Sequence, residues 1–367
     1  MFLTAGNLVH HLITRGLVSS DSVVDGDFVV AEAGRRNRNF KVIRSSGGLF
    51  VKQIKSVSSD AIATLQREAA FHQLLQSRKR PDNLVAVIPR LIDYDPATYS
   101  LAVELIPDGE DLSEYHVRVN DFPQSAGELA GRALGTFHAE TGPMLREPGV
   151  LHVIPRELPW IFTLDPQTLW PLTTMGAAGN QLSSMLRAMP DLLSLLVSLQ
   201  YEWQDKGLIH GDMKWENCVI FPESGERNGL RLVDWELVGV GDASWDAGAI
   251  FASYLLHLIF AVPASGGSAP DRVLGESQGM LQRMRPALAA FWREYGAAAR
   301  LKQSISYFWL LRTIRFCAAR LVTAAFEHMF NVGQATAQTI PMVHMARRIL
   351  LDPATAAIQM TGGEVRT

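Results

Sequence analysis

Residues 207–221, GLIHGDMKWENCVIF, place a cluster of polar residues between two short apolar runs. Such apolar runs are typical of short buried strands. A polar cluster at buried positions costs free energy unless its groups are hydrogen-bonded or hold a ligand. This stretch is therefore the candidate functional centre, and the surrounding segments are expected to support it.

The composition is that of a globular protein with a substantial core. The chain has 367 residues, of which 47% are hydrophobic, and a net charge of −3. This length allows two domains or two lobes. The negative charge argues against nucleic-acid binding, which requires a basic surface. Two cysteines, Cys218 and Cys317, are too few for a disulfide scaffold and fit a reducing compartment.

Two further patterns bear on location. The first residues of the chain lack the basic segment and cleavage site of a signal peptide. The apolar run 247–264 is short for a membrane span and contains Ser253, Tyr254 and His257, so it is predicted to be a core helix. We therefore expect a cytoplasmic protein with no membrane partner.

The first 106 residues predict a helical extension followed by a small β-rich lobe. Residues 1–22 carry apolar residues at helical spacing, and residues 23–106 form the lobe. Its β-rich segments are separated by turn-forming residues, which indicates an antiparallel meander followed by two more strands. These segments are 27–33, 40–45, 49–54, 90–95 and 100–106. One helix, 58–76, lies among them and can be capped by Ser58, Ser59 or Asp60.

The remaining residues, 107–367, predict a large, mainly helical lobe. It contains one hairpin, formed by residues 218–221 and 230–235 around a polar turn. The polar cluster of the opening stretch precedes this hairpin and Asp234 lies at its end, so the two sites can converge. The predicted fold class is thus α+β, with a small antiparallel sheet and one helix in the N-lobe and a helical C-lobe.

The polar cluster has the spacing that phosphoryl transfer requires. Its residues spell H-G-D-x-K-x-x-N from His210 to Asn217, and Asp234 follows in LVDWE. Phosphoryl transfer needs one carboxylate to orient an acceptor hydroxyl, and oxygen ligands to hold Mg²⁺ against the phosphates. Asp212 is therefore the candidate catalytic residue, and Asn217 and Asp234 are the candidate Mg²⁺ ligands.

These motifs resemble those of the aminoglycoside phosphotransferase and choline kinase-like family, whose fold is that of the protein kinases. The family motif H-G-D-x-x-x-x-N is matched without a gap, and its D-x-D or D-x-E segment is matched by Asp234 and Glu236. The resemblance spans about residues 23–250. It implies a bilobal protein-kinase-like fold, Mg-ATP as the phosphoryl donor and a hydroxyl group as the acceptor. Glu236 is either a second metal contact or a charge at the end of the hairpin.

The resemblance also implies nucleotide contacts in the N-lobe. Residues 34–42, GRRNRNFKV, resemble the hairpin that covers the phosphates, with Asn37 and Asn39 as candidate contacts. Lys52 stands where the family keeps the lysine that binds the α- and β-phosphates, and Glu68 stands where its ion-pair partner is expected. Backbone groups of a hinge that includes Glu104 and Ile106 would bind adenine.

Three residues of the C-lobe receive supporting roles. His210 is interpreted as a brace within the catalytic loop, and Asp246 stands where the family keeps the residue that braces this loop. Lys214 is unusual for small-molecule kinases and typical of protein Ser/Thr kinases, where it touches the transferring phosphate. Only twelve positions separate Asp234 from Asp246, which leaves little room for an activation loop.

The acceptor is the least determined feature. Residues 250–350 contain eleven basic and four acidic residues, a balance that disfavours a polycationic acceptor. A neutral or acidic acceptor is expected, either Ser or Thr of a biosynthetic precursor peptide or a small molecule. Lys214 and a resemblance to kinases of lanthipeptide-type pathways favour the peptide slightly, and a protein partner in a biosynthetic complex would fit it. A non-catalytic, nucleotide-binding pseudokinase is the alternative of another class.

Overall fold

The computed structural model describes residues 2–33, 37–77, 80–223, 227–261 and 278–363. The chain forms two compact units. The first unit comprises Met1–Glu110, His152–Ile154 and Val219–Val238, and the second comprises Asp111–Leu151, Pro155–Cys218 and Gly239–Thr367. The sequence-based boundaries follow the chain in order, whereas the hairpin segment Val219–Val238 belongs with the first unit.

A five-stranded antiparallel sheet forms the centre of the first unit. Its spatial order is β1-β2-β3-β5-β4, so the first three strands form the predicted meander. The strands are β1 (Val29–Glu32), β2 (Arg38–Ile43), β3 (Leu49–Gln53), β4 (Leu91–Asp95) and β5 (Ser100–Glu104). All five segments predicted as strands are therefore present in this sheet.

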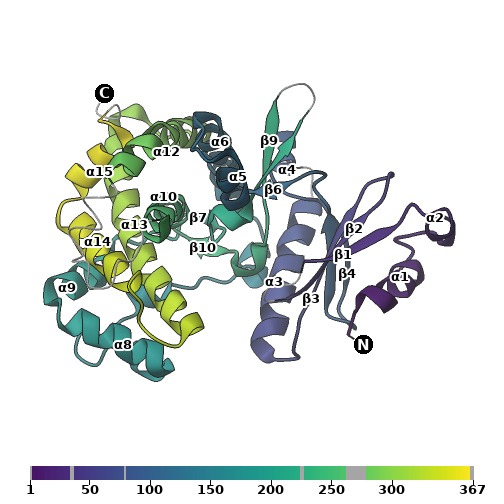
Figure 1. Cartoon of the computed structure of the whole chain (residues 1–367), viewed down its shortest axis with the longest axis horizontal. Helices are drawn as coiled ribbons and strands as arrows, with labels where there is room; N and C mark the ends of the chain where they lie inside the picture. Colours follow the sequence, from purple (N-terminus) through teal and green to yellow (C-terminus); the bar gives the residue numbers. More distant parts are fainter. Residues whose placement is uncertain (1, 34–36, 78–79, 224–226, 262–277, 364–367) are drawn as a thin grey trace. The chain divides into compact units, whose positions relative to one another are not determined.

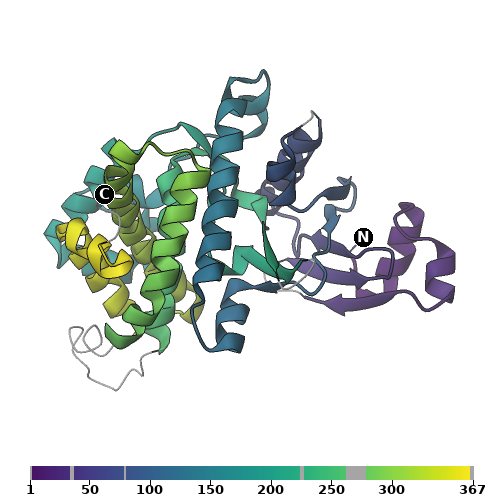
Figure 2. The ribbon, with the colours of Figure 1, turned by 90° about the horizontal axis from the view of Figure 1, so that it is seen from above.

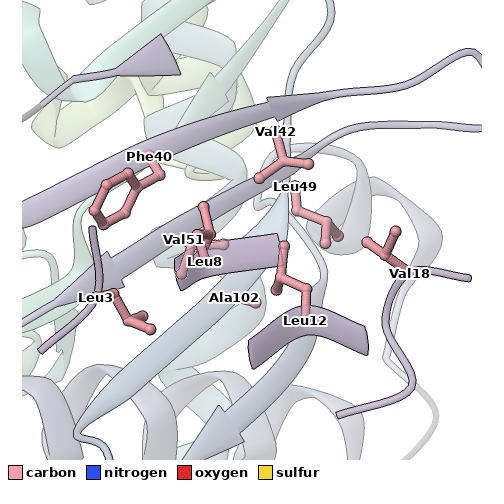
Figure 3. Packing of buried hydrophobic residues seen from close by; sticks show 9 residues of the cluster. All are labelled: Leu3, Leu8, Leu12, Val18, Phe40, Val42, Leu49, Val51 and Ala102. Carbon is pink, nitrogen blue, oxygen red and sulfur yellow. The ribbon is translucent and has the colours of Figure 1, made fainter. Parts of the chain in front are cut away.

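Helices cover the two faces of this sheet. The N-terminal helix α1 (Ala5–Thr14) begins at a capping box formed by Thr4 and Asn7 and packs its apolar side against one face. Figure 3 shows the resulting core, to which the helical segment and the strands both contribute. Its buried members are Leu3, Leu8, Leu12, Val18, Phe40, Val42, Leu49, Val51 and Ala102. The predicted N-terminal extension is thus part of the core of the first unit.

The opposite face of the sheet carries α3 (Ser59–Gln76), which is capped by the side chain of Ser58. Leu65 and Ala69 of this helix pack against Leu101 of β5. In Figure 1, α3 and α1 lie on opposite sides of the strands. Side chains alternate between faces along a strand. Because Val51 faces α1, its neighbour Lys52 faces α3, where Glu68 lies one turn from Leu65.

The first unit is completed by short elements. These are α2 (Ser20–Val24), α4 (Asp82–Ala86), β6 (Glu110–Asp111), β8 (Cys218–Pro222) and β9 (Asn228–Leu232). The strands β8 and β9 are neighbours in a small sheet of order β6-β8-β9 and form the predicted hairpin. The backbone N–H of Leu232 donates to the carbonyl of Val87, which ties the hairpin to the segment after α4.

The second unit is mainly helical. Its main helices are α5 (Leu112–Val119), α6 (Gln124–Thr141), α8 (Gly176–Arg187), α9 (Pro190–Leu199), α10 (Ala243–Ala261), α12 (Gln278–Ala298), α13 (Gln303–Val332), α14 (Thr339–Leu351) and α15 (Pro353–Thr361). Two short strands of this unit, β7 (Gly207–Ile209) and β10 (Gly239–Gly241), pair in antiparallel fashion. The short helix α7 (Val150–Val153) lies where the chain passes between the units.

Three glycines allow α6 and α12 to pack closely. Gly127, Gly131 and Gly135 recur every four residues and form one stripe along α6. A Cβ atom at Gly131 would lie 2.3 Å from the carbonyl oxygen of Phe291, so only glycine permits this approach. The two long helices run side by side in Figure 2, and this contact brings His138 of α6 next to Tyr295 of α12.

The apolar segment predicted as a core helix is α10. Among the described residues it is the single helix long and apolar enough to cross a membrane, apart from a pair, Gly176–Arg187 and Pro190–Glu202, that is bent by 108°. However, 78% of the apolar window of α10 is buried, as expected for the core helix of a soluble protein. Together the two units confirm the predicted α+β class, with a small antiparallel sheet and a large helical part.

Candidate active site

Lys52 lies at the centre of a charge cluster in the first unit, in which Lys52, Glu68 and Glu236 are buried and Asp234 is partly exposed. Its Nζ atom lies 2.7 Å from Glu68 Oε2 and 3.0 Å from Glu236 Oε2, and it also bonds to Asp234 Oδ1. The sequence predicted the pair of Lys52 with Glu68 as a bridge from strand to helix. The structure adds Asp234 and Glu236, which the chain brings back to the same ammonium group about 180 residues later.

The cluster shifts the pKa values of its members. Burial by itself lowers the pKa of Lys52, but the carboxylates of Glu68, Asp234 and Glu236 outweigh this effect and raise it. Burial raises the pKa of Glu68, and Lys52 opposes that shift. Three carboxylates share one ammonium group, so Lys52 stays charged.

Asp234 owes its position to an unusual backbone conformation. It has φ +66° and ψ +61°, the left-handed region that a residue with a Cβ atom rarely adopts. The next residue is held on both sides. The Trp235 N–H donates to Glu68 Oε1 at 3.3 Å, and its ring packs on Phe71 with centroids 4.7 Å apart. Strained residues of this kind persist where surrounding contacts fix them, and they cluster at functional sites.

The same carboxylates are suited to a divalent cation. Ligand oxygens of Glu68, Asp234 and Glu236 all lie within 4.8 Å of one another. When all three are ionised, one ammonium group leaves two negative charges uncompensated. Mg²⁺ prefers carboxylate oxygens, so the donor set of the first unit fits this ion.

The other predicted contacts of the first unit are placed as follows. Asn37 Nδ2 donates to Glu236 Oε2 at 3.4 Å, and Asn39 lies opposite Lys52 in the sheet. Gly34, Arg35 and Arg36 of the phosphate-covering hairpin lie outside the described residues.

The hinge candidates differ from each other. The backbone N–H of Glu104 donates to Arg90, and its carboxylate pairs with Arg231 at 2.8 Å. Leu105 donates to Gly48. The backbone N–H of Ile106 makes no backbone hydrogen bond within the part of the chain that the structure describes. Ile106 is therefore the better placed of the two to offer a backbone donor.

In the second unit, a loop after β7 presents Asp212. Its carboxylate oxygen Oδ2 lies 2.5 Å from Lys214 Nζ. The Asn217 side chain is buried and its Nδ2 donates to the Asp212 carbonyl at 2.7 Å, so its amide oxygen faces away from that carbonyl. The loop thus brings Lys214 and Asn217 into contact with Asp212, the predicted catalytic residue.

Asp246 holds this loop through hydrogen bonds to its backbone. Its carboxylate is fully buried and accepts the backbone N–H groups of His210 at 2.6 Å and Gly211 at 3.0 Å. It also lies 3.1 Å from His138 Nε2, while His138 Nδ1 lies 3.0 Å from the Tyr295 hydroxyl. The ring of His210 accepts the Asp212 N–H at 3.4 Å.

Arg320 is the residue that sequence reasoning missed. It lies on α13, and its guanidinium lies 3.5 Å from Asp212 Oδ1. It also stacks at 4.9 Å on Trp245, whose indole N–H donates to the Gly211 carbonyl. No local pattern distinguishes Arg320 from the other arginines of this long helix, so only the tertiary contact reveals it.

The basic excess of residues 250–350 is largely neutralised inside the second unit. Six arginines of this region other than Arg320 pair with acidic residues from outside it, so the charge count does not describe an acceptor surface. The pairs are Arg283–Asp121, Arg293–Glu128, Arg300–Glu140, Arg312–Asp242, Arg315–Glu202 and Arg347–Asp191. The basic residues of this region therefore no longer favour a neutral or acidic acceptor.

Known proteins share sequence features with this chain. The model of the phosphotransferase enzyme family matches residues 27–294. The viomycin phosphotransferase of Streptomyces vinaceus is 35% identical over 106 residues, which is 28% of this chain and 32% of that protein. The match thus spans about a third of the length of that relative.

Solved structures share the fold. An ethanolamine kinase of Plasmodium vivax has a TM-score of 0.57 at 15% identity, over 94% of this chain and 84% of that one. A GDP complex of an aminoglycoside 2′-phosphotransferase has a TM-score of 0.53 at 14% identity, over 96% and 98%. These likenesses confirm the predicted kinase-like fold. Because the family model covers most of the chain, the family predicted from its motifs is confirmed as well: the chain belongs to the phosphotransferase enzyme family.

Proposed function

We propose that this protein transfers the γ-phosphoryl group of Mg-ATP to a hydroxyl group of a small molecule. The observation that carries this proposal is the catalytic loop, in which Asp212 is presented next to Lys214 by a loop that the buried Asp246 holds. A carboxylate in such a loop is what the reaction needs to orient an acceptor hydroxyl. The free, buried thiols of Cys218 and Cys317 fit a cytoplasmic location.

The donor side of the reaction would use the first unit. Lys52 would bind the α- and β-phosphates while Glu68 holds its ammonium group, and the N–H of Ile106 would bind adenine. Asn37 and Asn39 would contact the phosphates. Bound Mg²⁺ would supply positive charge against the phosphate oxygens. Its proposed ligands are Asp234 and Asn217, and Glu236 is a further carboxylate near Asp234.

The acceptor side would use the catalytic loop. The acceptor oxygen forms a bond to the γ-phosphorus, the bond from that phosphorus to the β–γ bridging oxygen breaks, and ADP leaves. Asp212 orients the hydroxyl and takes its proton. Lys214 turns from Asp212 to the transferring phosphoryl group and balances its charge. Most of the rate enhancement would come from positioning and charge stabilisation.

A small molecule is favoured as the acceptor by the named substrates of proteins with this fold, ethanolamine and aminoglycosides. The precursor peptide that the sequence slightly preferred has no support among these proteins. Its remaining argument is Lys214, which stands two residues after Asp212 as in protein Ser/Thr kinases. A peptide Ser or Thr is therefore the second candidate acceptor, and a protein partner belongs to that alternative alone.

The experiment is a phosphotransfer assay with labelled ATP and Mg²⁺. The acceptors are ethanolamine, choline, kanamycin, viomycin and a peptide fraction of a cell extract, with Asp212→Asn as the control. We expect label on at least one small molecule, and a loss on the order of 10²-fold or more in kcat with Asp212→Asn. Label confined to the peptide fraction would support the second candidate. Nucleotide binding without any transfer would indicate a pseudokinase instead. An Asp212→Asn variant as active as wild type would show that Asp212 is not the catalytic residue.

A further inference from the structure

The two oxygens of the Asp212 carboxylate have different partners, and the difference suggests different tasks. Lys214 contacts Oδ2 from within the same loop, at 2.5 Å. Arg320 contacts Oδ1 at 3.5 Å from the middle of α13, 108 residues further along the chain. The carboxylate is therefore flanked by two cations from separate elements.

The two cations differ in how firmly they are held. The Lys214 side chain is 40% exposed, whereas the Arg320 side chain is 12% exposed. Arg320 is further fixed by its stacking on Trp245, which is itself 3% exposed and hydrogen-bonded to Gly211 in the catalytic loop. A planar guanidinium on an aromatic face loses little side-chain entropy when it forms a directed contact. Arg320 is therefore the fixed partner of Asp212 and Lys214 the exchangeable one.

This difference matters when a phosphoryl group arrives. If Lys214 turns to that group, Oδ2 is released to accept the hydroxyl of the acceptor. Once the Lys214 contact is lost, rotation about the Asp212 side chain would move Oδ2 away from the hydroxyl. Arg320 supplies the missing hold at Oδ1. Glu327 lies two turns further along α13. Burial raises the pKa of its carboxyl, Arg320 and Lys214 oppose that shift and Asp212 adds to it, so Glu327 belongs to the same group of charges.

We propose that Arg320 is a positioning residue that fixes the Asp212 carboxylate for attack by the acceptor hydroxyl. This inference rests on the proposed function, since it assigns Arg320 a task in that reaction. Arg320 acts through Asp212 and needs no contact with the substrate. It also links α13 to the catalytic loop, so the helix and the loop would keep a constant relation during turnover.

The test compares Arg320→Met with Arg315→Met. Arg315 lies on the same helix, is partly buried and pairs with Glu202, so it is a matched control outside the catalytic loop. The reactions followed are phosphate release from Mg-ATP with water as acceptor and transfer to the most active compound of the acceptor panel. We expect Arg320→Met to lower kcat by between about 10- and 100-fold in both, because small misplacements of a reacting group have effects of this size. KM for ATP should stay within about twofold of wild type, and thermal stability should match that of Arg315→Met.

Two further measurements separate positioning from mere structure. Combined with Asp212→Asn, the Arg320→Met change should cause no additional loss of kcat, because Arg320 acts through Asp212. Guanidinium ion added to Arg320→Ala, or the change Arg320→Lys, should restore part of kcat. Losses that add in the double variant, or a kcat of Arg320→Met equal to that of Arg315→Met, would overturn the inference and leave the proposed function standing. A wild-type protein without either reaction would overturn both.

Discussion

The carboxylate of Asp246 accepts the backbone N–H of His210 at 2.6 Å, although the two residues lie 36 positions apart in the sequence. The second oxygen of the same carboxylate accepts the N–H of Gly211, and Gly211 has φ +83°, a conformation that glycine adopts without strain. A helix N-terminus therefore fixes the backbone that presents Asp212. The acidic side chain also suits the first turn of α10, because negative charge is stabilised there.

Asp246→Asn should weaken both stability and activity. The amide has one acceptor oxygen in place of two, so one backbone N–H of the loop loses its partner in a buried place. We expect a loss of about 1–3 kcal/mol in the free energy of unfolding, measured by urea titration, together with a lower kcat. Asp191→Asn, which breaks an exposed pair with Arg347, is the control and should cost no more than about 1 kcal/mol. Equal losses in the two variants would show that Asp246 is not a brace.

Lys52→Met should disturb nucleotide use more than the neighbouring change Lys55→Met. Removing the ammonium group leaves Glu68, Asp234 and Glu236 without their shared cation, so the carboxylates repel one another and the phosphates lose their partner. We expect a higher KM for ATP and a kcat reduced on the order of 10²-fold, as for other charge-stabilising groups. Lys55 is exposed and follows the strand, and its variant should keep activity within about twofold of wild type. Steady-state kinetics at saturating Mg²⁺ would measure both, and comparable losses would contradict the assignment of Lys52.

Glu236→Gln distinguishes the two roles that the sequence left open. If Glu236 helps to hold Mg²⁺, losing its charge should raise the Mg²⁺ concentration for half-maximal activity by about threefold to tenfold, since ligand charge tunes cation affinity. Its contact with Lys52 at 3.0 Å would weaken at the same time. A titration of activity with Mg²⁺ at fixed ATP would measure the shift. An unchanged Mg²⁺ dependence would mean that Glu236 only compensates Lys52.

His116 predicts how stability responds to acid. Burial lowers the pKa of His116 to about 4, and its Nδ1 donates to the carbonyl of Asp121 at 3.0 Å. Between its ordinary pKa of 6.5 and this value, the unfolded chain binds a proton that the folded chain does not, so stability falls as the pH falls through this window. We expect about 3 kcal/mol of this loss to come from His116. His116→Asn keeps a donor for Asp121 and removes the titration.

The measurement for His116 is urea unfolding of wild type and His116→Asn at pH 7, 5.5 and 4. The difference in free energy of unfolding between the two proteins should change in favour of the variant as the pH falls. If the free energies of unfolding of the two proteins changed in parallel over the whole pH range, His116 would not be the source of the acid sensitivity.

Gly131→Ala tests the close packing of α6 against α12. The new Cβ atom would meet the Phe291 carbonyl, and forcing the helices apart should cost about 1–3 kcal/mol, as overpacking usually does. Gly296→Ala, within α12, meets no atom within 4 Å and should instead stabilise the helix by up to about 1 kcal/mol. Thermal unfolding of both variants would measure these opposite signs. A neutral Gly131→Ala variant would mean that the two helices can separate without cost.

The sequence by itself determined the family, the α+β class and the strands of the first unit. The spacing of His210, Asp212 and Asn217 is local, because a loop that presents a carboxylate and an amide needs them within one or two turns of chain. The pairing of Lys52 with Glu68 could also be predicted from the sequence, because strand alternation and helix spacing determine the direction of each side chain. Periodicity and motif spacing extend over a few residues, and each of these features depends on residues that are that close in the sequence.

Only the tertiary structure decided the rest. Three kinds of contact join residues 70 or more positions apart: the approach of Glu236 to Lys52, the contact of Arg320 with Asp212, and the pairing of the other arginines with their acidic partners. Electrostatic contacts depend on distance in space, and a charge count along the chain carries no information about which charges meet. The sequence motifs therefore predict the chemistry of the site, whereas tertiary packing determines which side chains hold those motifs in place.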